Sequence, residues 1–195
     1  MSNYSVISDV GNGIVKLLRR HMVPEMIASS DAIGLCSPED KGDLSLGVYL
    51  YDVKESEEMM GLRKQSTSET TMKAPSQYLN LYYMITAYSS SDIKFRASEE
   101  HRILGRTIQV LWDNGVLGTE YLNETGGNME YPVRIEMLRL DNEEKIKLWN
   151  TPNLPYKLSL YYKVYPVEIE SLKVKTIRRV VEADFAVDEK NGNNR

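Results

Sequence analysis

The sequence has little cysteine, little histidine and no long apolar run, and each shortage excludes a class of protein. Among its 195 residues there are one cysteine, Cys36, and two histidines, His21 and His101. A single cysteine excludes an internal disulfide and a cysteine-rich zinc site, and we expect Cys36 to be a small buried apolar side chain. Because no run of about 18 apolar residues occurs, we expect no membrane span and no membrane partner. The N-terminal residues have no basic segment before an apolar core, so we expect no signal peptide and synthesis in the cytoplasm.

Catalytic motifs are also missing. The sequence contains no Gly-x-Ser-x-Gly, no P-loop, no histidine pair at helical spacing and no Cys/His pairing. His101 stands beside two glutamates and an arginine, but a solvent-facing helical turn explains this cluster better than a metal site does, since no second ligand follows at helical spacing. Gly11-Asn12-Gly13 lacks the preceding strand of a dinucleotide turn, so we interpret these small residues as permitting close packing. We predict no catalytic residue, no cofactor and no metal.

Charge and composition are typical of a globular interaction protein. The net charge is -4 at pH 7, with 42% hydrophobic and 27% charged residues. An acidic chain is a poor ligand for a phosphate backbone, so we expect no nucleic-acid partner. The chain carries 13 tyrosines, which concentrate in predicted strands and suit half-buried sheet faces and protein interfaces. Its length is enough for one domain and too short for a second independent core.

Alternating apolar residues predict the strands. The clearest stretch is Pro75–Ser89, whose two faces are both largely apolar or aromatic, so we expect it inside a sheet that is covered on both sides. Leu44–Val53 is a second long strand. A shorter one has Val133, Ile135 and Met137 inward and their neighbours outward. Tyr156–Tyr165 is a further strand, which Pro166 ends or bends.

Apolar residues at three- and four-residue spacing predict the helices. The first runs from Ser5 or Asp9 to His21. The second starts near Ser98 and ends at Asn114. Its buried side is predicted to hold Ile103, Leu104, Ile108 and Leu111, with Trp112 as a further candidate. A third, short helix runs over Asn142–Trp149 and is opened by a capping box of Asp141 and Glu144.

Two segments have patterns typical of contact regions. Lys54–Lys73 is polar and without periodicity over twenty residues, which indicates a loop that is either mobile or ordered by a partner. Leu172–Val187 alternates apolar and charged residues and contains a basic run, which suits pairing at a sheet edge. The final 188–195 is a disordered tail by composition. We therefore divide the chain into a domain over 1–171, an arm over 172–187 and this tail.

Several blocks of the sequence together resemble one family. They are VYLYDV from Val48, YLNLYYMITAY from Tyr78, EHRILGR from Glu100, VLWD from Val110, KLW from Lys147 and LPYKLSLYY from Leu154. In this order they are similar to the N-terminal domain of the cap, or tail-terminator, proteins of phage-tail-like contractile injection systems of the antifeeding-prophage and virulence-cassette type. The resemblance covers about Ser5 to Ser171. Glu55–Lys73 and Gln77 depart from the family's pattern, which affects the expected shape of the loop there.

The resemblance implies an α/β (α+β) fold, a single domain with a mixed, mainly antiparallel sheet flanked by helices, as in phage tail terminators. It also implies a structural cap: a homohexameric ring on the end of the inner tube and sheath opposite the baseplate, which ends polymerisation. Its partners would be further copies of itself, the inner-tube protein and the sheath protein. Assembly would take place in the cytoplasm, in a particle that can be released outside the cell.

Contacts to these partners are expected in the Lys54–Lys73 loop, in the Ser89–Arg96 turn and along the arm, because these are long or polar excursions from rigid strands. The candidate interface residues are Met59, Met60, Leu62, Arg63, Lys64, Lys94, Arg96, Lys173, Lys175, Arg178, Arg179 and Phe185. The alternatives are an adaptor or baseplate component of the same kind of particle and, with less support, an enzyme. For each segment, a plain solvated loop or edge also remains open.

Overall fold

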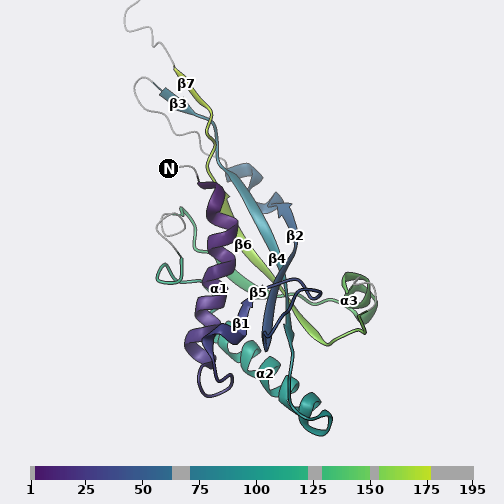
Figure 1. Cartoon of the computed structure of the whole chain (residues 1–195). Coiled ribbons are helices and arrows are strands. Elements are labelled where there is room, and N and C mark those ends of the chain that lie inside the picture. Colours follow the sequence, from purple (N-terminus) through teal and green to yellow (C-terminus); the bar gives the residue numbers. More distant parts are fainter. Residues whose placement is uncertain (1–2, 63–70, 123–128, 150–153, 177–195) are drawn as a thin grey trace, which may run out of the picture.

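The chain folds around one five-stranded sheet flanked by helices (Figure 1). The structure is a computed structural model and describes residues 3–62, 71–122, 129–149 and 154–176. Within these residues the elements, with η for a 3-10 helix, are η1 (Asn3–Ser5), α1 (Val6–Met22), η2 (Ser30–Ala32), β1 (Ile33–Leu35), β2 (Leu46–Glu55), η3 (Glu57–Leu62), β3 (Thr71–Lys73), β4 (Gln77–Ala87), α2 (Ile93–Asp113), β5 (Arg134–Met137), α3 (Asn142–Leu148), β6 (Ser159–Ile169) and β7 (Val174–Thr176). This is the α+β class that the sequence predicts.

The predicted central strand is confirmed. The strand order is β1-β2-β4-β6-β5, which puts β4 in the middle of the sheet. β4 pairs antiparallel with β2 and β6, β5 pairs antiparallel with β6, and only β1 is parallel, to β2. β4 is buried along nearly its whole length, because the side chains of a middle strand meet neighbours on both faces.

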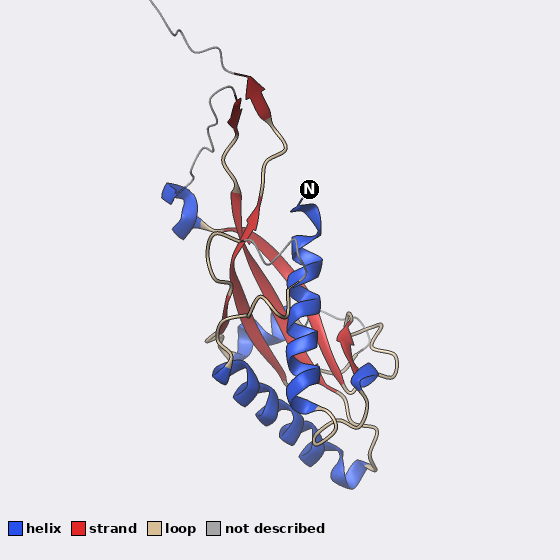
Figure 2. Ribbon diagram, turned by 90° about the vertical axis from the view of Figure 1, so that its left-hand side faces the viewer, coloured by secondary structure: helices blue, strands red, loops and turns tan. Residues whose placement is uncertain are grey.

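The main core lies between one face of the sheet and the helices α1 and α2 (Figure 2). The apolar stripe of α1 is buried in it, as predicted, through Val6, Val10, Ile14, Leu17, Leu18 and Met22. Arg19 ties α1 to the edge of the sheet, since its guanidinium donates to the Ile33 carbonyl at 2.6 and 3.0 Å. At Gly13 a Cβ would stand 3.1 Å from the Tyr121 carbonyl oxygen, which confirms close packing as the role of this glycine.

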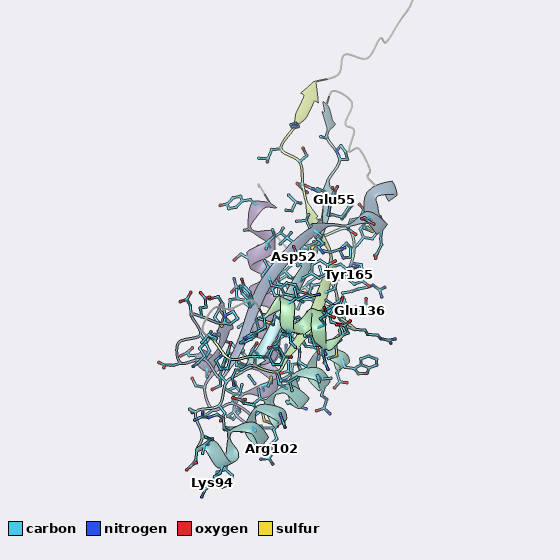
Figure 3. The ribbon with its side chains drawn as sticks, turned by 90° about the vertical axis from the view of Figure 1, so that its right-hand side faces the viewer. Asp52, Glu55, Lys94, Arg102, Glu136 and Tyr165 are labelled. Carbon is cyan, nitrogen blue, oxygen red and sulfur yellow. The ribbon has the colours of Figure 1, made fainter. Side chains whose placement is uncertain are left out.

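The opposite face of the sheet carries α3 (Figure 3). The predicted capping box is confirmed: the Asp141 side chain accepts the Glu144 N–H at 2.8 Å, and the Glu144 carboxylate accepts the Asp141 N–H at 2.9 Å. Trp149, directly after α3, packs against Tyr161 in a second, small core. The Tyr161 hydroxyl donates to the Lys145 carbonyl at 3.2 Å and so connects α3 with the sheet.

α2 begins five residues before the predicted start near Ser98. Asp92 is its N-cap, with the side chain accepting the Lys94 N–H at 3.3 Å, so Ile93–Arg96 is the first helical turn and no longer part of a loop. The buried residues of α2 are Ile103, Leu104, Thr107, Val110 and Leu111.

The predicted burial of Ile108 and Trp112 in α2 is wrong. Their side chains are 37% and 85% exposed, because the packed stripe is narrow and both lie beside it. Met137 was likewise expected inward, but it ends the edge strand β5 and is 43% exposed.

The predicted strand boundaries also need correction. β2 extends to Glu55, and the remainder of the supposed loop holds η3 and β3. β6 starts at Ser159 and continues through Pro166 to Ile169, with a bulge in its pairing to β4 at this point, so the proline bends the strand without ending it. Cys36 is half-buried and free, not fully buried as expected.

Candidate interaction surfaces

A two-stranded ribbon projects from one end of the sheet. β3 pairs antiparallel with β7, and the Ala74 N–H donates to the Lys173 carbonyl at 3.0 Å. Both views show the ribbon extending beyond the sheet and the helices (Figures 1 and 2). An isolated two-stranded ribbon is marginally stable in water, so this projection favours contact with another chain.

The predicted arm residues fall on and beyond this ribbon. Lys173 is exposed just before β7, and Lys175 lies within β7. Arg178, Arg179 and Phe185 lie outside the described residues. The arm thus begins as a strand that already pairs, on one of its edges, with β3 of its own chain.

The candidate residues of the Lys54–Lys73 segment lie toward the same end. η3 contains Met59, Met60 and Leu62, and Met59 is half-buried. Arg63 and Lys64 lie outside the described part of the chain.

The tip of α2 is at the other end of the molecule, where Figure 3 shows Lys94. Lys94 and Arg96 are exposed there, as candidate contact residues should be. Between and beside them, Ile93 and Phe95 are 78% and 67% exposed. Sequence reasoning missed these two apolar residues, although a helix start at Asp92 would have placed them in an unpacked first turn. The structure thus separates those candidate contact residues that it describes into two groups, at opposite ends.

The sheet face that carries α3 has a cluster of tyrosines. The Tyr51 ring lies 6.2 Å from that of Tyr82 and 5.9 Å from that of Tyr161, measured between centroids. Burial, with a smaller effect of neighbouring rings, raises the pKa of Tyr51 and of Tyr161 to about 12, so both hydroxyls stay neutral at physiological pH. The Lys163 ammonium sits 4.1 Å above the Tyr165 ring and 3.1 Å from the Glu58 carboxylate.

Two hollows are lined mainly by apolar side chains. One, of about 600 Å³, lies between the end of α2, β5 and α3, and includes Trp112 and Met137. The other, of about 540 Å³, lies between the first half of α1 and the strands β1 and β2, and includes Ile7, Leu50 and Tyr83. Neither was foreseen from the sequence, because each joins residues that are distant along the chain.

The described residues hold no cluster of side chains suited to bind a metal ion. His101 is exposed on α2, which agrees with the interpretation of a solvent-facing turn. No helix in the described ranges has the length and apolar character needed to cross a membrane.

Two solved structures have a fold similar to this one, which defines the fold class. Both match with a TM-score of 0.67. One is the sheath/tube terminator of PVC, an extracellular contractile injection system, in the extended state, with 14% identity over 96% of this chain and 65% of that one. The other is the tube-terminating cap of the anti-feeding prophage, with 21% identity over 95% of this chain and 63% of that one.

The chain itself belongs to the Pvc16 N-terminal domain family, which it matches over residues 9–183. The resemblance noted in the sequence blocks and the predicted fold are therefore confirmed. This chain spans somewhat under two thirds of the length of the two terminator chains. A comparison with curated proteins found no match.

Proposed function

We propose that this protein is a structural cap that ends the inner tube and sheath of a contractile injection particle. The observation that carries the proposal is family membership over 9–183 together with a fold shared by two terminators across nearly the whole chain. Exposed apolar residues at the α2 tip and a projecting ribbon at the opposite end are consistent with a protein that contacts other chains on several sides.

Stacked rings explain why such a particle needs a cap. A head-to-tail stack of rings has a heterologous contact that does not close, so it grows until something blocks its end. A terminator offers one complementary face only. We propose a homohexameric ring that binds the last inner-tube ring and the adjoining sheath, on the particle end opposite the baseplate.

The two ends of the molecule suit different contacts. At one end, the α2 tip offers Ile93 and Phe95 flanked by Lys94 and Arg96, an apolar pair with a basic rim. At the other end lie η3, with Met59, and the ribbon. We propose that the candidate residues in these two groups, including those outside the described ranges, contact the neighbouring subunits, the tube or the sheath.

Locating the protein in the particle tests this function against its closest alternative. We would label the chain, assemble particles and image them by electron microscopy. Label at the terminus without a baseplate, together with overlong tubes when the protein is omitted, is the expected result. Label at the baseplate would instead identify an adaptor or baseplate component and refute the cap.

The arm is tested by truncation. A chain ending at Ser171 loses β7 but keeps every strand of the main sheet. We expect it to fold, as circular dichroism would report, and to detach from particle ends at lower salt or dilution than the full chain. A chain lacking only 188–195 is the matched control and should cap normally. If the shorter chain also caps normally, the arm has no part in attachment.

We also propose that the protein acts without catalysis, that it assembles with the particle in the cytoplasm, and that it leaves the cell only as part of the particle. Hydrolytic activity of the purified chain on a panel of ester, phosphate and peptide substrates would contradict the first point. Finding the chain outside cells without tube protein would contradict the last.

A further inference from the structure

On the outer edge of the main sheet, β1 covers only three of the ten residues of β2. β1 pairs with Leu46–Val48, the first three residues of β2, and the Cys36 N–H donates to the Val48 carbonyl at 3.2 Å. Beyond Cys36 the chain no longer pairs with β2. From Tyr49 to Val53, β2 has no strand neighbour on this side within the described residues. Val48 turns its backbone toward the edge, so alternation makes Leu50 the next residue to present backbone groups there.

An apolar groove lies directly beside this open edge. It is the hollow between α1, β1 and β2, and Ile7, Leu35 and Leu50 line it. Tyr83, 1% exposed, also lines it, and the Tyr83 hydroxyl is buried without a hydrogen-bond partner in the described structure. A buried hydroxyl without a partner is unfavourable by roughly 1–3 kcal/mol, so this side of the groove is not fully satisfied in the monomer.

The ribbon has the complementary open edge. In the two-stranded ribbon, β7 pairs with β3 on one edge. Its other edge has no strand neighbour within the described residues. Just before β7, Leu172 and Lys173 are both exposed, so the arm offers one apolar and one basic side chain for contact. Within the arm, 174–176 form β7, and the open stretch of β2 from 49 to 55 is long enough to pair with all of it.

Charge favours the same pairing. The open part of β2 carries two carboxylates, on Asp52 and Glu55, and one ammonium group, on Lys54, and Glu57 follows directly in η3. Figure 3 shows Asp52 and Glu55 on this part of the molecule. The exposed Lys173 of an incoming arm would therefore meet an excess of negative charge.

We propose that the open edge of β2, from Tyr49 to Val53, and the groove beside it receive the arm of a second copy of this chain, Leu172–Thr176. The outer edge of the arm's β7 pairs with β2, giving an intermolecular sheet in the order β3-β7-β2-β4-β6-β5. The arm's own ribbon extends away from its own sheet (Figure 1), so a second copy supplies the partner. This inference rests on the proposed ring of copies and names the surfaces that close it. This pairing would cover the open edges of β2 and β7 at once. Open strand edges otherwise promote non-specific association with other chains.

Crosslinking between two different copies tests the proposal. In a Cys36→Ser background, one chain carries Val53→Cys, at a 41% exposed position on the open stretch of β2, and a second, differently tagged chain carries Lys173→Cys. Because each chain has one thiol, a mixed product must join two copies. The chains are mixed with tube protein and treated with a short bis-maleimide. We expect at least tenfold more mixed product than with the control pair Lys94→Cys and Lys173→Cys, whose first thiol lies at the far end of the molecule.

The outcomes separate this inference from the proposed function. Capped tubes with mixed product no greater than in the control overturn the arm site and leave the cap function intact. Strong mixed product with uncapped tubes supports the contact between copies and counts against the cap. Should Val53→Cys prevent folding, Lys54→Cys, at an exposed position on the same open stretch, replaces it with the same expected result.

Discussion

At the scale of single residues, buried hydroxyl groups differ in whether they have a partner. The Tyr161 hydroxyl donates to the Lys145 carbonyl, and the Thr86 and Ser159 hydroxyls hydrogen-bond each other at 2.7 Å inside the sheet. The Tyr83 hydroxyl has no partner in the described structure, and burial raises its pKa, so it stays protonated. A polar group that is buried without a hydrogen-bond partner loses its hydrogen bonds to water and gains none in the monomer. The pair Tyr83 and Tyr161 therefore allows a matched comparison.

We expect Tyr83→Phe to leave the free energy of unfolding of the monomer unchanged or to raise it by up to about 1 kcal/mol, because no hydrogen bond is lost. Tyr161→Phe should lower it by about 1 kcal/mol, because the Lys145 carbonyl loses its donor. Urea unfolding of dilute protein, followed by tryptophan fluorescence, measures both. A clear loss for Tyr83→Phe would mean that its hydroxyl is satisfied after all.

At the scale of elements, α1 and α2 cover the same face of the sheet but are packed differently. α1 is buried on the side that includes Gly11 and Gly13, and it meets the 117–122 segment closely. α2 is held along a narrow stripe, and around its Gly105 no atom lies within 4 Å of an added Cβ. A glycine-to-alanine substitution should therefore change the free energy of unfolding in opposite directions in the two helices.

Gly105→Ala should raise the free energy of unfolding by about 0.5–1 kcal/mol through helix propensity alone. Gly13→Ala gains the same propensity, but its Cβ would stand 3.1 Å from the Tyr121 carbonyl and from the Leu117 side chain. We expect the free energy of unfolding of this variant to fall by about 1 kcal/mol, because overpacking typically destabilises by more than the gain in helix propensity stabilises. Thermal unfolding of the two variants beside the parent protein is the measurement. If both substitutions changed the stability equally, the 117–122 segment would have to move aside for the added methyl group without loss of stability.

The loop before α2 is held to the helix by the carboxylates of Glu99 and Glu100, of which Glu100 accepts the Ser89 N–H at 3.1 Å. Glu99 accepts hydrogen bonds from the hydroxyls of Ser89 and Ser91, and these bonds lower its pKa from the usual value near 4.5. A carboxyl group whose pKa is lower in the folded state stabilises the fold above its unfolded pKa. That contribution is lost as the pH falls through the folded value.

We therefore expect Glu99→Gln to be less stable than the parent protein at pH 7, and the difference to shrink as the pH falls toward about 3. Urea unfolding across this range would measure it. Ser89→Ala with Ser91→Ala should reproduce the change in pH dependence. A difference that is independent of pH would contradict the role of the carboxylate charge.

At the scale of the whole molecule, the chain has chemically different ends. The α2 tip is apolar with basic neighbours, while the open part of β2 is surrounded by acidic side chains. Such differences suit a head-to-tail ring, in which each copy presents one surface and receives another. Exposed charges across a contact also make association depend on ionic strength.

If the basic arm meets the acidic edge of a second copy, raising salt from about 0.05 to 0.5 M should reduce the fraction of assembled protein, since the Debye length falls from roughly 14 to 4 Å. Analytical ultracentrifugation at fixed protein concentration reports this fraction. Lys173→Glu should give less assembly at low salt and a weaker salt dependence. Assembly that increases with salt would favour an apolar contact instead.

Local patterns in the sequence were enough for the elements and their caps. The alternation in Pro75–Ser89, the stripe of α1 and the Asp141 capping box all follow from interactions within a few residues. The errors at Ile108, Trp112 and Met137 have one cause. These side chains are apolar, but whether they are covered depends on helix angles and strand ends that no local pattern encodes.

The sequence by itself determined the kind of protein: an α+β domain with a tyrosine-rich central strand and the blocks of a cap-protein family. Only the tertiary structure decided where surfaces lie. It placed Lys94 and Arg96 at one end and the ribbon at the other, left most of the outer edge of β2 without a strand neighbour in the described residues and set Tyr83 beside a groove. The physical reason is that secondary structure depends on neighbours along the chain, whereas an edge or a groove exists only between segments that folding brings together.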